Sequence, residues 1–595
     1  MPVIDPNQPR SNLPRPEPRY FGPEERALFG WLHRAPDDVA SRDVGVVICR
    51  PLGYEGLCSH RSMLHFAAAA AAAGFPALRF DYDGTGDSAG GAIGSHRREA
   101  WEASVEAAIC ELQRATGVTK VCLLGARIGA AIAARHALMR TDVVGLAVIA
   151  PVISGTAWLR EVRALQATMG RPDPPSEMTL PEGATESLGV LLTAETQAAV
   201  KAIDLLTIDR APAPHCLVLD RNDRPPSVAW CEHLERHGAQ VTHRVLPGFV
   251  EMMLPPHEAV VPQAMVDEFR AWLVRHFDVT GEVDISPPSP TKTGPVAVAP
   301  EVEERAVFFD PSQTLFGIVT APTDDQPERA LIVLNSGAKH HVGNGGMWVT
   351  FARRLARRGW VVIRIDVSGI GDSLPQPGAS ENDVYTPNAI ADLESTIRFA
   401  RERLGAKHVE VTGLCSGAYH SLKGAAAGLP LDGITIINPL VFAWKPGMSL
   451  AYPPYQMVQA AAQYQRSVLQ FKKWVDLVRG RVDLRTIAEV LVHRLLDRAQ
   501  GLARDLGRMI GVAPSDDLGG ELCRIVDRGV AVRFVFSAGD PGEALLRVGA
   551  GWVLPRLHRR GQLSVAYLPN CDHSLSSWWM RELLWAELVR GIGQE

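Results

Sequence analysis

The chain has little that would tie it to a membrane, a nucleic acid or a metal. Its 595 residues hold no apolar run close to the roughly 20 residues that a membrane-spanning helix needs. The net charge of −5 leaves no basic surplus for binding nucleic acid. No H-E-x-x-H or other metal-ligand spacing occurs. We therefore expect no membrane span, no nucleic-acid partner, no metal and no other cofactor.

Cysteine is also sparse. The nine cysteines are odd in number and form no C-x-x-C pair, which argues against a zinc site and favours a reducing compartment. Residues 1–20 are rich in proline and lack an apolar core. They indicate a flexible arm rather than a signal peptide. The predicted location is the cytoplasm.

What is present is an ordinary globular composition, with 46% hydrophobic and 21% charged residues. A chain of 595 residues exceeds what one hydrophobic core usually serves, so two or more domains are expected. Strand-like segments alternate with helical patterns in both halves of the chain. This alternation is typical of α/β folds, in which a mostly parallel sheet is flanked by helices.

The two halves of the chain repeat each other. Gly-Thr-Gly-Asp-Ser at 84–88 returns as Gly-Ile-Gly-Asp-Ser at 369–373. Other matched segments are 27–32 with 314–319, 44–49 with 330–335, 74–81 with 359–366 and 121–129 with 409–417. The two pentapeptides lack the Lys-Ser/Thr ending of a phosphate loop and are too short for a dinucleotide fingerprint. We interpret them as tight connections between a strand and a helix.

This duplication predicts two tandem domains of one α/β fold. The expected boundaries are 21–280 for the first domain and 301–595 for the second. Residues 281–300 between them are rich in Pro, Ser and Thr and should form a semi-extended linker.

The segment 409–423, VEVTGLCSGAYHSLK, reads as a strand, a sharp turn and a helix, with Cys415 at the turn. A nucleophile elbow needs this context, because its central residue is strained and its neighbours must be small. Gly413 and Gly417 meet that need. The sulfur would stand at a helix N-terminus, where the dipole favours the thiolate.

An acid and a base follow the candidate nucleophile. Asp540 lies in the turn after the strand-like segment 532–536, and His573 lies after the strand-like segment 563–568. The order nucleophile, acid, histidine predicts Cys415 as nucleophile, His573 as general base and Asp540 as the residue that orients the imidazole. Asp572 is a weaker candidate for the acid, because adjacent side chains seldom face each other.

An oxyanion hole in such a site uses two backbone N–H groups. One is expected from Ser416, the residue after the nucleophile. The other is expected from the loop after the strand-like segment 331–334, and Ala338 is our choice there. The same loop carries His340 and His341, whose side chains could face either the pocket or solvent.

The first repeat has lost the equivalent residues. Alignment of the repeats places Arg127 opposite Cys415, Asp223 opposite the acid and Glu251 opposite the base. Arginine stays protonated in proteins and is no nucleophile. We expect a degenerate site in which Arg127 and Glu251 form an ion pair. The rival interpretation, that Arg127 binds a substrate carboxylate or phosphate, is opposed by the nearby Glu251.

The segment 442–529 of the second half is predicted to be a helical cap over the site, because apolar residues recur there at helical spacing. Its other face is basic, which is usual for a solvated surface and would also suit an acidic carrier protein. The basic residues are Lys472, Lys473, Arg479, Arg481, Arg485, Arg494 and Arg498.

Motifs in both halves resemble the α/β hydrolases. In the second half these are LNSGAKHHVG, RIDVSGIGDSLPQPG, GLCSGAYHS, INPL and SAGDPGE followed by DHS. In the first half, RPLGYEGLCSHRS and LRFDYDGTGDSAG resemble the serine-aminopeptidase-like and exosortase-associated branches. The resemblance covers nearly the whole chain after residue 20. It implies two tandem α/β-hydrolase domains and a role beside acyl-carrier, acyl-ligase or non-ribosomal-peptide systems. The chain departs from the family in having Cys for the commoner Ser, and Arg in the first elbow.

A cysteine nucleophile favours acyl transfer, because amines attack a thioester more readily, relative to water, than they attack an oxoester. The first hypothesis is therefore a thioesterase or acyltransferase with an acyl-Cys intermediate, loaded from CoA, from an acyl or peptidyl carrier protein, or from an activated ester. The second is a small-molecule ester or lactone hydrolase. The third is a non-catalytic tandem binding module. The pattern is compatible with a homodimer.

Overall fold

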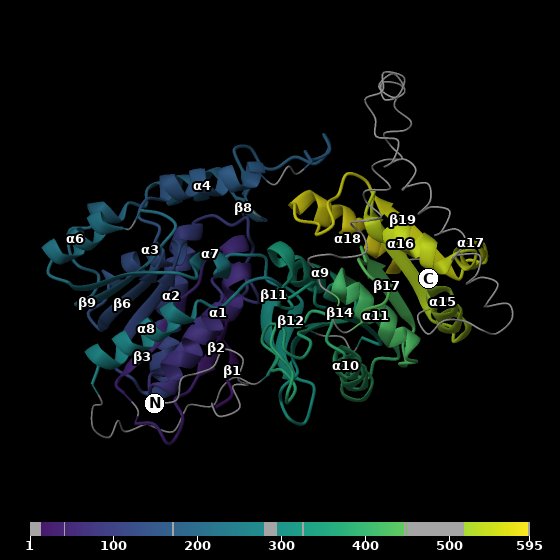
Figure 1. Cartoon of the computed structure of the whole chain (residues 1–595), viewed down its shortest axis with the longest axis horizontal. Helices are drawn as coiled ribbons and strands as arrows, with labels where there is room; N and C mark the ends of the chain where they lie inside the picture. The colour runs from purple at the N-terminus through teal and green to yellow at the C-terminus, as the bar shows by residue number, and fades with distance from the viewer. Residues whose placement is uncertain are drawn as a thin grey trace. The chain divides into compact units, whose positions relative to one another are not determined.

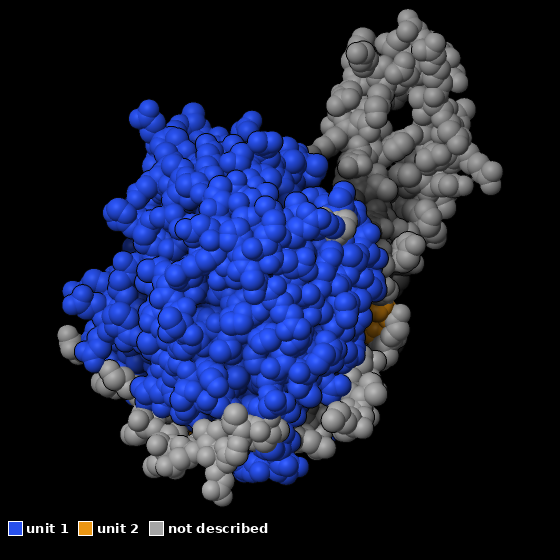
Figure 2. All heavy atoms as spheres, turned by 90° about the vertical axis from the view of Figure 1, so that its left-hand side faces the viewer, with its two compact units in different colours: residues 1–327, 338–383, 576–582 blue, residues 328–337, 384–575, 583–595 orange. Residues whose placement is uncertain are grey.

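The computed structural model describes residues 14–40, 42–168, 172–187, 189–225, 227–278, 294–323, 327–445, 448 and 517–592. Most of the predicted cap at 442–529, including its basic residues, lies outside these ranges. The chain divides into two compact units (Figure 2). Unit 1 comprises residues 1–327, 338–383 and 576–582, and unit 2 comprises 328–337, 384–575 and 583–595. The boundaries predicted from the sequence repeat stay a prediction.

Unit 1 holds an eight-stranded sheet in the order β1-β2-β4-β3-β5-β6-β9-β10 (Figure 1). Its strands are β1 (Glu17–Phe21), β2 (Leu28–His33), β3 (Val44–Cys49), β4 (Ala77–Phe80), β5 (Lys120–Ala126), β6 (Val143–Ile149), β9 (His215–Arg221) and β10 (Gln240–Leu246). The pairs β1–β2 and β2–β4 are antiparallel, and all other pairs are parallel.

Helices cover both faces of this sheet. The strands are apolar along nearly their whole length, so both faces of the sheet must be covered to keep these side chains away from water. In β3, Val46 and Ile48 face the core that contains α1 (Gly53–Ala72) and α8 (Gln263–His276). Val47 faces the opposite core. That core contains α2 (Arg97–Thr116), α3 (Ile128–Ala137), α4 (Gly155–Thr168), α5 (Ala194–Lys201) and α6 (Val228–Arg236).

Unit 1 also contains strands from the second repeat. They are the antiparallel run β11 (Val296–Ala299), β12 (Val302–Phe308), β13 (Phe316–Pro322) and β15 (Trp360–Ile365), with α9 (Met347–Ala356). An apolar core joins this run to the first repeat, because Trp31 of β2 packs edge-on against Phe316 of β13 with ring centroids 4.5 Å apart. The short elements are β7 (Thr185–Ser187), β8 (Val190–Leu192) and α7 (Phe249–Met252).

Unit 2 contains five parallel strands in the order β14-β16-β17-β18-β19. They are β14 (Arg329–Leu334), β16 (His408–Leu414), β17 (Gly433–Ile437), β18 (Ala531–Ser537) and β19 (Leu563–Leu568). The helices of unit 2 include α10 (Ala389–Arg403), α11 (Ser416–Ala426), α15 (Leu518–Asp527), α16 (Pro541–Ala550) and α17 (Val553–Arg559). The helix α18 (Trp578–Ile592) is divided between the two units after residue 582. The predicted fold class, α/β with mostly parallel sheets flanked by helices, is confirmed.

The repeated Gly-x-Gly-Asp-Ser motifs make the same hydrogen bonds in both copies. Ser88 Oγ donates to the Asp81 carbonyl at 2.6 Å and accepts from the Phe29 N–H at 2.9 Å. Ser373 Oγ does the same with Asp366 at 2.5 Å and Phe316 at 2.8 Å. Both motifs are thus tight turns after a strand, held by their own serine. Among the described helices, none is long and apolar enough to cross a membrane.

Candidate active site

The turn between β16 and α11 holds Cys415 in a strained conformation, with φ 59° and ψ −110°. Such a backbone costs about 1–3 kcal/mol in a residue other than glycine and persists only where its surroundings enforce it. Here the Cys415 N–H donates to the Ile437 carbonyl at 2.9 Å, and its carbonyl accepts from the Tyr419 N–H at 3.2 Å. The side chain is half-buried. This is the geometry of a nucleophile elbow.

The glycines on either side of Cys415 have no room for a side chain. A Cβ on Gly413 would lie 2.3 Å from the Gly417 carbonyl carbon, and a Cβ on Gly417 would lie 2.5 Å from the Asn335 carbonyl oxygen. Both contacts are with backbone atoms, which cannot swing away as a flexible side chain would.

The substitution Gly417→Ala should therefore destabilise unit 2 by about 1–3 kcal/mol through overpacking. A lowered thermal unfolding midpoint would show this. Gly91→Ala is a matched control, because a Cβ there meets nothing within 4 Å. Equal midpoints for the two variants would contradict the steric argument.

The candidate base and acid are hydrogen-bonded to each other. His573 Nδ1 lies 2.8 Å from Asp540 Oδ2. Asp540 is buried and caps α16, accepting from the Gly542 N–H at 2.9 Å with Oδ1. One carboxylate thus starts a helix and fixes the imidazole. The His573 side chain keeps 29% of its surface exposed. Asp572, the weaker candidate for the acid, is held through its backbone: its carbonyl accepts a hydrogen bond from Ser537 Oγ at 2.9 Å.

The charge on His573 depends on Cys415. Burial lowers the pKa of His573, but the Cys415 thiolate, and to a lesser extent the hydrogen bond to Asp540, raise it to about 10. Near neutral pH this favours an imidazolium beside a thiolate. A thiolate is the nucleophilic form of cysteine, and an imidazolium can protonate a leaving group.

Removing the thiolate should therefore shift the titration of His573. In the wild-type protein the ring should keep its proton from pH 6 to 9, whereas in Cys415→Ala its pKa should be lower. NMR of ring-labelled histidine would measure both curves, with His573→Gln used to assign the signal among the 18 histidines. Superimposable curves would show that the two side chains are not coupled.

Other cysteines differ from Cys415. Burial raises the pKa of Cys49 and of Cys216 to about 12, so both remain neutral thiols in the core. Cys523 is half-buried like Cys415. Its sulfur accepts a hydrogen bond from Arg556 Nη2 at 3.0 Å. Cys523 is consequently the natural control for thiol reactivity in unit 2.

Asn438 holds the loop that carries His573, and sequence reasoning missed this role. Its Nδ2 donates to the His573 carbonyl and to Ser537 Oγ, both at 2.9 Å, and its Oδ1 accepts from the Ser537 N–H at 2.7 Å. Asn438 is fully buried and has φ 43°. The sequence did contain a hint, because the repeats align Asn438 with Ala150, which has no amide group. Both residues have positive φ in the structure.

The oxyanion hole stays a prediction. The Ser416 side chain is buried, and its Oγ accepts from the Gly337 N–H at 2.8 Å. This bond occupies the Gly337 N–H and leaves the backbone N–H of Ser416 as the donor expected from the elbow. Ala338 belongs to unit 1, and its predicted contribution is untested.

The first repeat keeps the elbow but not its chemistry. Arg127 has φ 53° and ψ −123°, close to Cys415, and its N–H donates to the Ile149 carbonyl at 3.0 Å. Its buried guanidinium donates to Glu55 at 2.7 Å and to Glu161 at 2.8 Å. Burial lowers the pKa of Arg127, but the two glutamates outweigh this and raise it. An ion-pair cluster therefore fills this elbow.

The predicted ion pair between Arg127 and Glu251 is wrong. The guanidinium donates instead to Glu55 of α1 and Glu161 of α4, and Glu251 is exposed on α7. Asp223 is also exposed and bonds to Arg221 at 2.6 Å. The alignment of the repeats paired equivalent positions in the sequence. The carboxylates that reach the Arg127 guanidinium come instead from α1 and α4.

One family model matches part of the chain. Residues 52–185 match the family model described as serine aminopeptidase, S33. No curated protein matches the chain.

Solved structures of hydrolases resemble parts of the chain. A putative hydrolase from Agrobacterium vitis S4 is 19% identical, covers 44% of this chain and 99% of its own, with a TM-score of 0.29. XC6422 from Xanthomonas campestris, an α/β serine hydrolase without lid, is 17% identical. The match covers 45% of this chain and 97% of that chain, with a TM-score of 0.30. Est1E from Butyrivibrio proteoclasticus, solved with ferulic acid, is 13% identical. The match covers 43% of this chain and 98% of that chain, with a TM-score of 0.33. Likenesses of this size do not bear on the reaction.

Proposed function

We propose that the chain is an acyl-transfer enzyme that works through an acyl-Cys intermediate on Cys415. The observation that carries the proposal is the strained elbow cysteine, together with an imidazole that a buried carboxylate holds in the same unit. The acyl donor is a thioester of CoA or of a carrier protein, or another activated acyl group. The acceptor is water, an amine or a hydroxyl.

The first half-reaction loads the enzyme. The Cys415 thiolate attacks the acyl carbonyl carbon, and the backbone N–H of Ser416 stabilises the oxyanion that forms. The tetrahedral intermediate collapses, its bond to the leaving sulfur or oxygen breaks, and the imidazolium of His573 donates its proton to the leaving group. The products are the acyl-Cys415 thioester and the free thiol or alcohol.

The second half-reaction releases the acyl group. Neutral His573 accepts a proton from water, an amine or an alcohol as that nucleophile attacks the thioester carbonyl. The bond from carbon to Cys415 sulfur then breaks, which regenerates the thiolate beside an imidazolium. Asp540 and Asn438 hold the ring and its loop in place throughout.

Intact-mass spectrometry with a panel of acyl-CoA and acyl-pantetheine thioesters tests the loading step. Wild-type protein should gain the mass of one acyl group, Cys415→Ala should gain none, and Cys523→Ala should behave like the wild type. Candidate amines added to the loaded protein then separate transferase from hydrolase, because only a transferase forms the amide faster than the acid.

An ester or lactone hydrolase is the second candidate, and the same triad favours it equally, because acyl-Cys enzymes also hydrolyse oxoesters. Aryl esters that turn over while every thioester stays inert would select this function. An alkylation rate for Cys415 no faster than that of Cys523, with no adduct from any donor, would overturn both candidates in favour of a binding module.

A further inference from the structure

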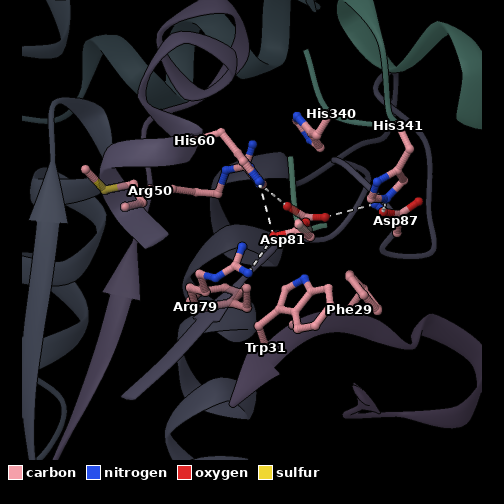
Figure 3. A pocket seen from close by; sticks show the side chains of 13 residues that line it. Phe29, Trp31, Arg50, His60, Arg79, Asp81, Asp87, His340 and His341 are labelled. Carbon is pink, nitrogen blue, oxygen red and sulfur yellow. Dashed lines mark hydrogen bonds and ion pairs between the residues drawn. The ribbon is translucent and has the colours of Figure 1, made fainter. Parts of the chain in front are cut away.

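The loop that follows β14 is held by the first repeat inside unit 1 (Figure 3). The ring of His340 stacks on that of His60 of α1, with centroids 4.1 Å apart and planes within 9°. His341 Nε2 lies 2.7 Å from Asp87 Oδ2, and the His341 N–H donates to Asp366 at 2.6 Å. Both histidines of the loop are buried, so neither faces solvent. From this loop the second donor of the oxyanion hole is expected.

The start of α18 has an anchor of the same kind. Glu186 lies on β7, in the hairpin that β7 and β8 of the first repeat form. Its Oε1 accepts from the Trp578 N–H at 2.8 Å and from Arg581 Nη2 at 3.4 Å. The two charged side chains are 8% and 9% exposed, so solvent screens this ion pair little. Because Trp578 follows His573 by five residues, this carboxylate fixes the end of the loop that carries the base.

Arg581 joins the two loops inside unit 1. Its Nη1 donates to the Asn344 carbonyl at 3.4 Å and to the Ser576 carbonyl at 3.5 Å. The turn of the hairpin packs on the same place, because a Cβ on Gly345 would lie 2.8 Å from the Gly189 carbonyl oxygen. One guanidinium, paired with the hairpin carboxylate, therefore contacts the end of the loop after β14 and the end of the loop after β19.

The loop that carries His573 is strained and needs to be held. Leu575 has φ 52°. Such a backbone costs about 1–3 kcal/mol in a residue other than glycine and persists only where its surroundings enforce it. Within unit 2, the buried Leu575 side chain and the bond from Asn438 to the His573 carbonyl restrain the loop. Glu186 restrains its end through Trp578. A strained loop relaxes when one end is released, and the imidazole then moves with it.

We propose that Glu186 of the first repeat is a positioning residue for the reaction at Cys415, because it fixes the loops that carry His573 and the expected oxyanion-hole donor. This inference rests on the function proposed above. It gives the first repeat, whose own elbow carries Arg127, a role in that reaction. The hairpin with Glu186 lies between β6 and β9, where the second repeat has its predicted cap between β17 and β18. The degenerate repeat uses its counterpart of the cap to hold two loops of the second repeat inside unit 1.

Kinetics of acyl loading measure the effect of Glu186. Glu186→Ala removes the acceptor of the Trp578 N–H, and a displacement of the base by about 1 Å can slow a reaction about 10²-fold. The maximal loading rate should therefore fall about 10–100-fold. The donor concentration at half-maximal rate should not change, because Glu186 does not contact the donor. Glu186→Gln keeps one oxygen for both donors and should load at close to the wild-type rate. Rapid-quench mass spectrometry over a range of donor concentrations gives both constants.

The pH dependence of Cys415 alkylation tests the same inference without acyl transfer. An imidazolium that lies farther from the sulfur stabilises the thiolate less. Iodoacetamide should therefore reach its half-maximal rate with Cys415 at a higher pH in Glu186→Ala than in the wild type or in Glu186→Gln. Peptide mass spectrometry follows each cysteine separately, and the profile of Cys523 should be the same in all samples. A purely structural role of Glu186 would not move the Cys415 profile of the folded protein.

Two further variants separate positioning from folding. Glu186→Asp keeps the charge but is one methylene shorter, so its carboxylate falls short of the Trp578 N–H and the variant should resemble Glu186→Ala. It replaces Glu186→Ala in both measurements if that variant does not fold. Glu182→Ala removes an exposed carboxylate of the same segment and should behave like the wild type. Thermal unfolding midpoints identify any variant whose fold is damaged.

The outcomes separate this inference from the proposed function. A loading rate and an alkylation profile in Glu186→Ala that match the wild type would overturn the positioning role. Losses that merely follow the fraction of folded protein, with an unchanged rate in that fraction, would overturn it too. If the wild type takes up no acyl group from any donor, the proposed function fails and the alkylation profiles decide alone. A shifted Cys415 profile in Glu186→Ala then supports the positioning of His573, and an unshifted one contradicts it.

Discussion

Replacing His573 with glutamine is expected to slow acyl loading of the protein by about 10²–10⁴-fold, the usual worth of a general acid–base residue. The thiolate of Cys415 loses its counter-cation, and the leaving group loses its proton donor. Rapid-quench mass spectrometry of the loading step measures the effect directly. It does so without a contribution from the second half-reaction, which also uses this histidine.

Asp540→Asn is a matched companion to His573→Gln. Asparagine caps a helix as well as aspartate does, so α16 should start normally at Pro541. An amide has one oxygen, whereas the carboxylate uses Oδ1 for the Gly542 N–H and Oδ2 for the imidazole. While the amide oxygen caps the helix, the amide NH₂ group faces His573 Nδ1 and favours the wrong tautomer of the ring. A loss of loading rate comparable with that of His573→Gln is therefore expected. Unchanged rates in both variants would contradict the proposed triad.

Sequence patterns were sufficient where one local rule dominates. The elbow around Cys415 needed only a strand, two glycines and a helix, and its positive φ follows from that local geometry. The alternation of strands and helices likewise predicted the fold class, because parallel strands need helices to cover them. The proximity of Asp540 to His573 followed from chain order, since the ends of neighbouring parallel strands β18 and β19 meet at one sheet edge.

Patterns failed where the partner of a side chain is chosen by packing between distant segments. Aligning the repeats located Arg127 at the first elbow, but nothing in its spacing pointed to Glu161 on α4. The bond from Asn438 to the His573 carbonyl joins residues 135 positions apart. His341 lies in a loop whose sequence suits a pocket and solvent equally, yet its side chain is fully buried between two aspartates. Which partner a buried side chain takes depends on the charges that segments distant in the sequence bring next to it.

Arg364→Met should destabilise unit 1 by on the order of 3–5 kcal/mol. The guanidinium is fully buried and donates to Asp87 at 2.5 Å and to Glu304 at 3.0 Å. Methionine fills much of the same space but leaves both carboxylates short of a partner in a medium that solvates charge poorly. Arg398→Met is the control, because that side chain is 59% exposed and lies 3.9 Å from its acidic partner, Glu394. It should cost less than about 1 kcal/mol.

The loss caused by Arg364→Met should also shrink as the pH falls. Burial alone would raise the pKa of Asp87, but Arg364 and His341 hold it well below its ordinary value, so this carboxylate stabilises the wild type above pH ~4 and less below it. In the variant the carboxylate protonates more easily and its unpaired charge disappears. Denaturant unfolding at pH 7 and at pH 4 should therefore give a larger wild-type–variant difference at pH 7. Adding Asp87→Asn to Arg364→Met should recover part of the loss at pH 7. A difference that is independent of pH, or a double variant whose losses simply add, would mean that Arg364 stabilises the fold by packing alone.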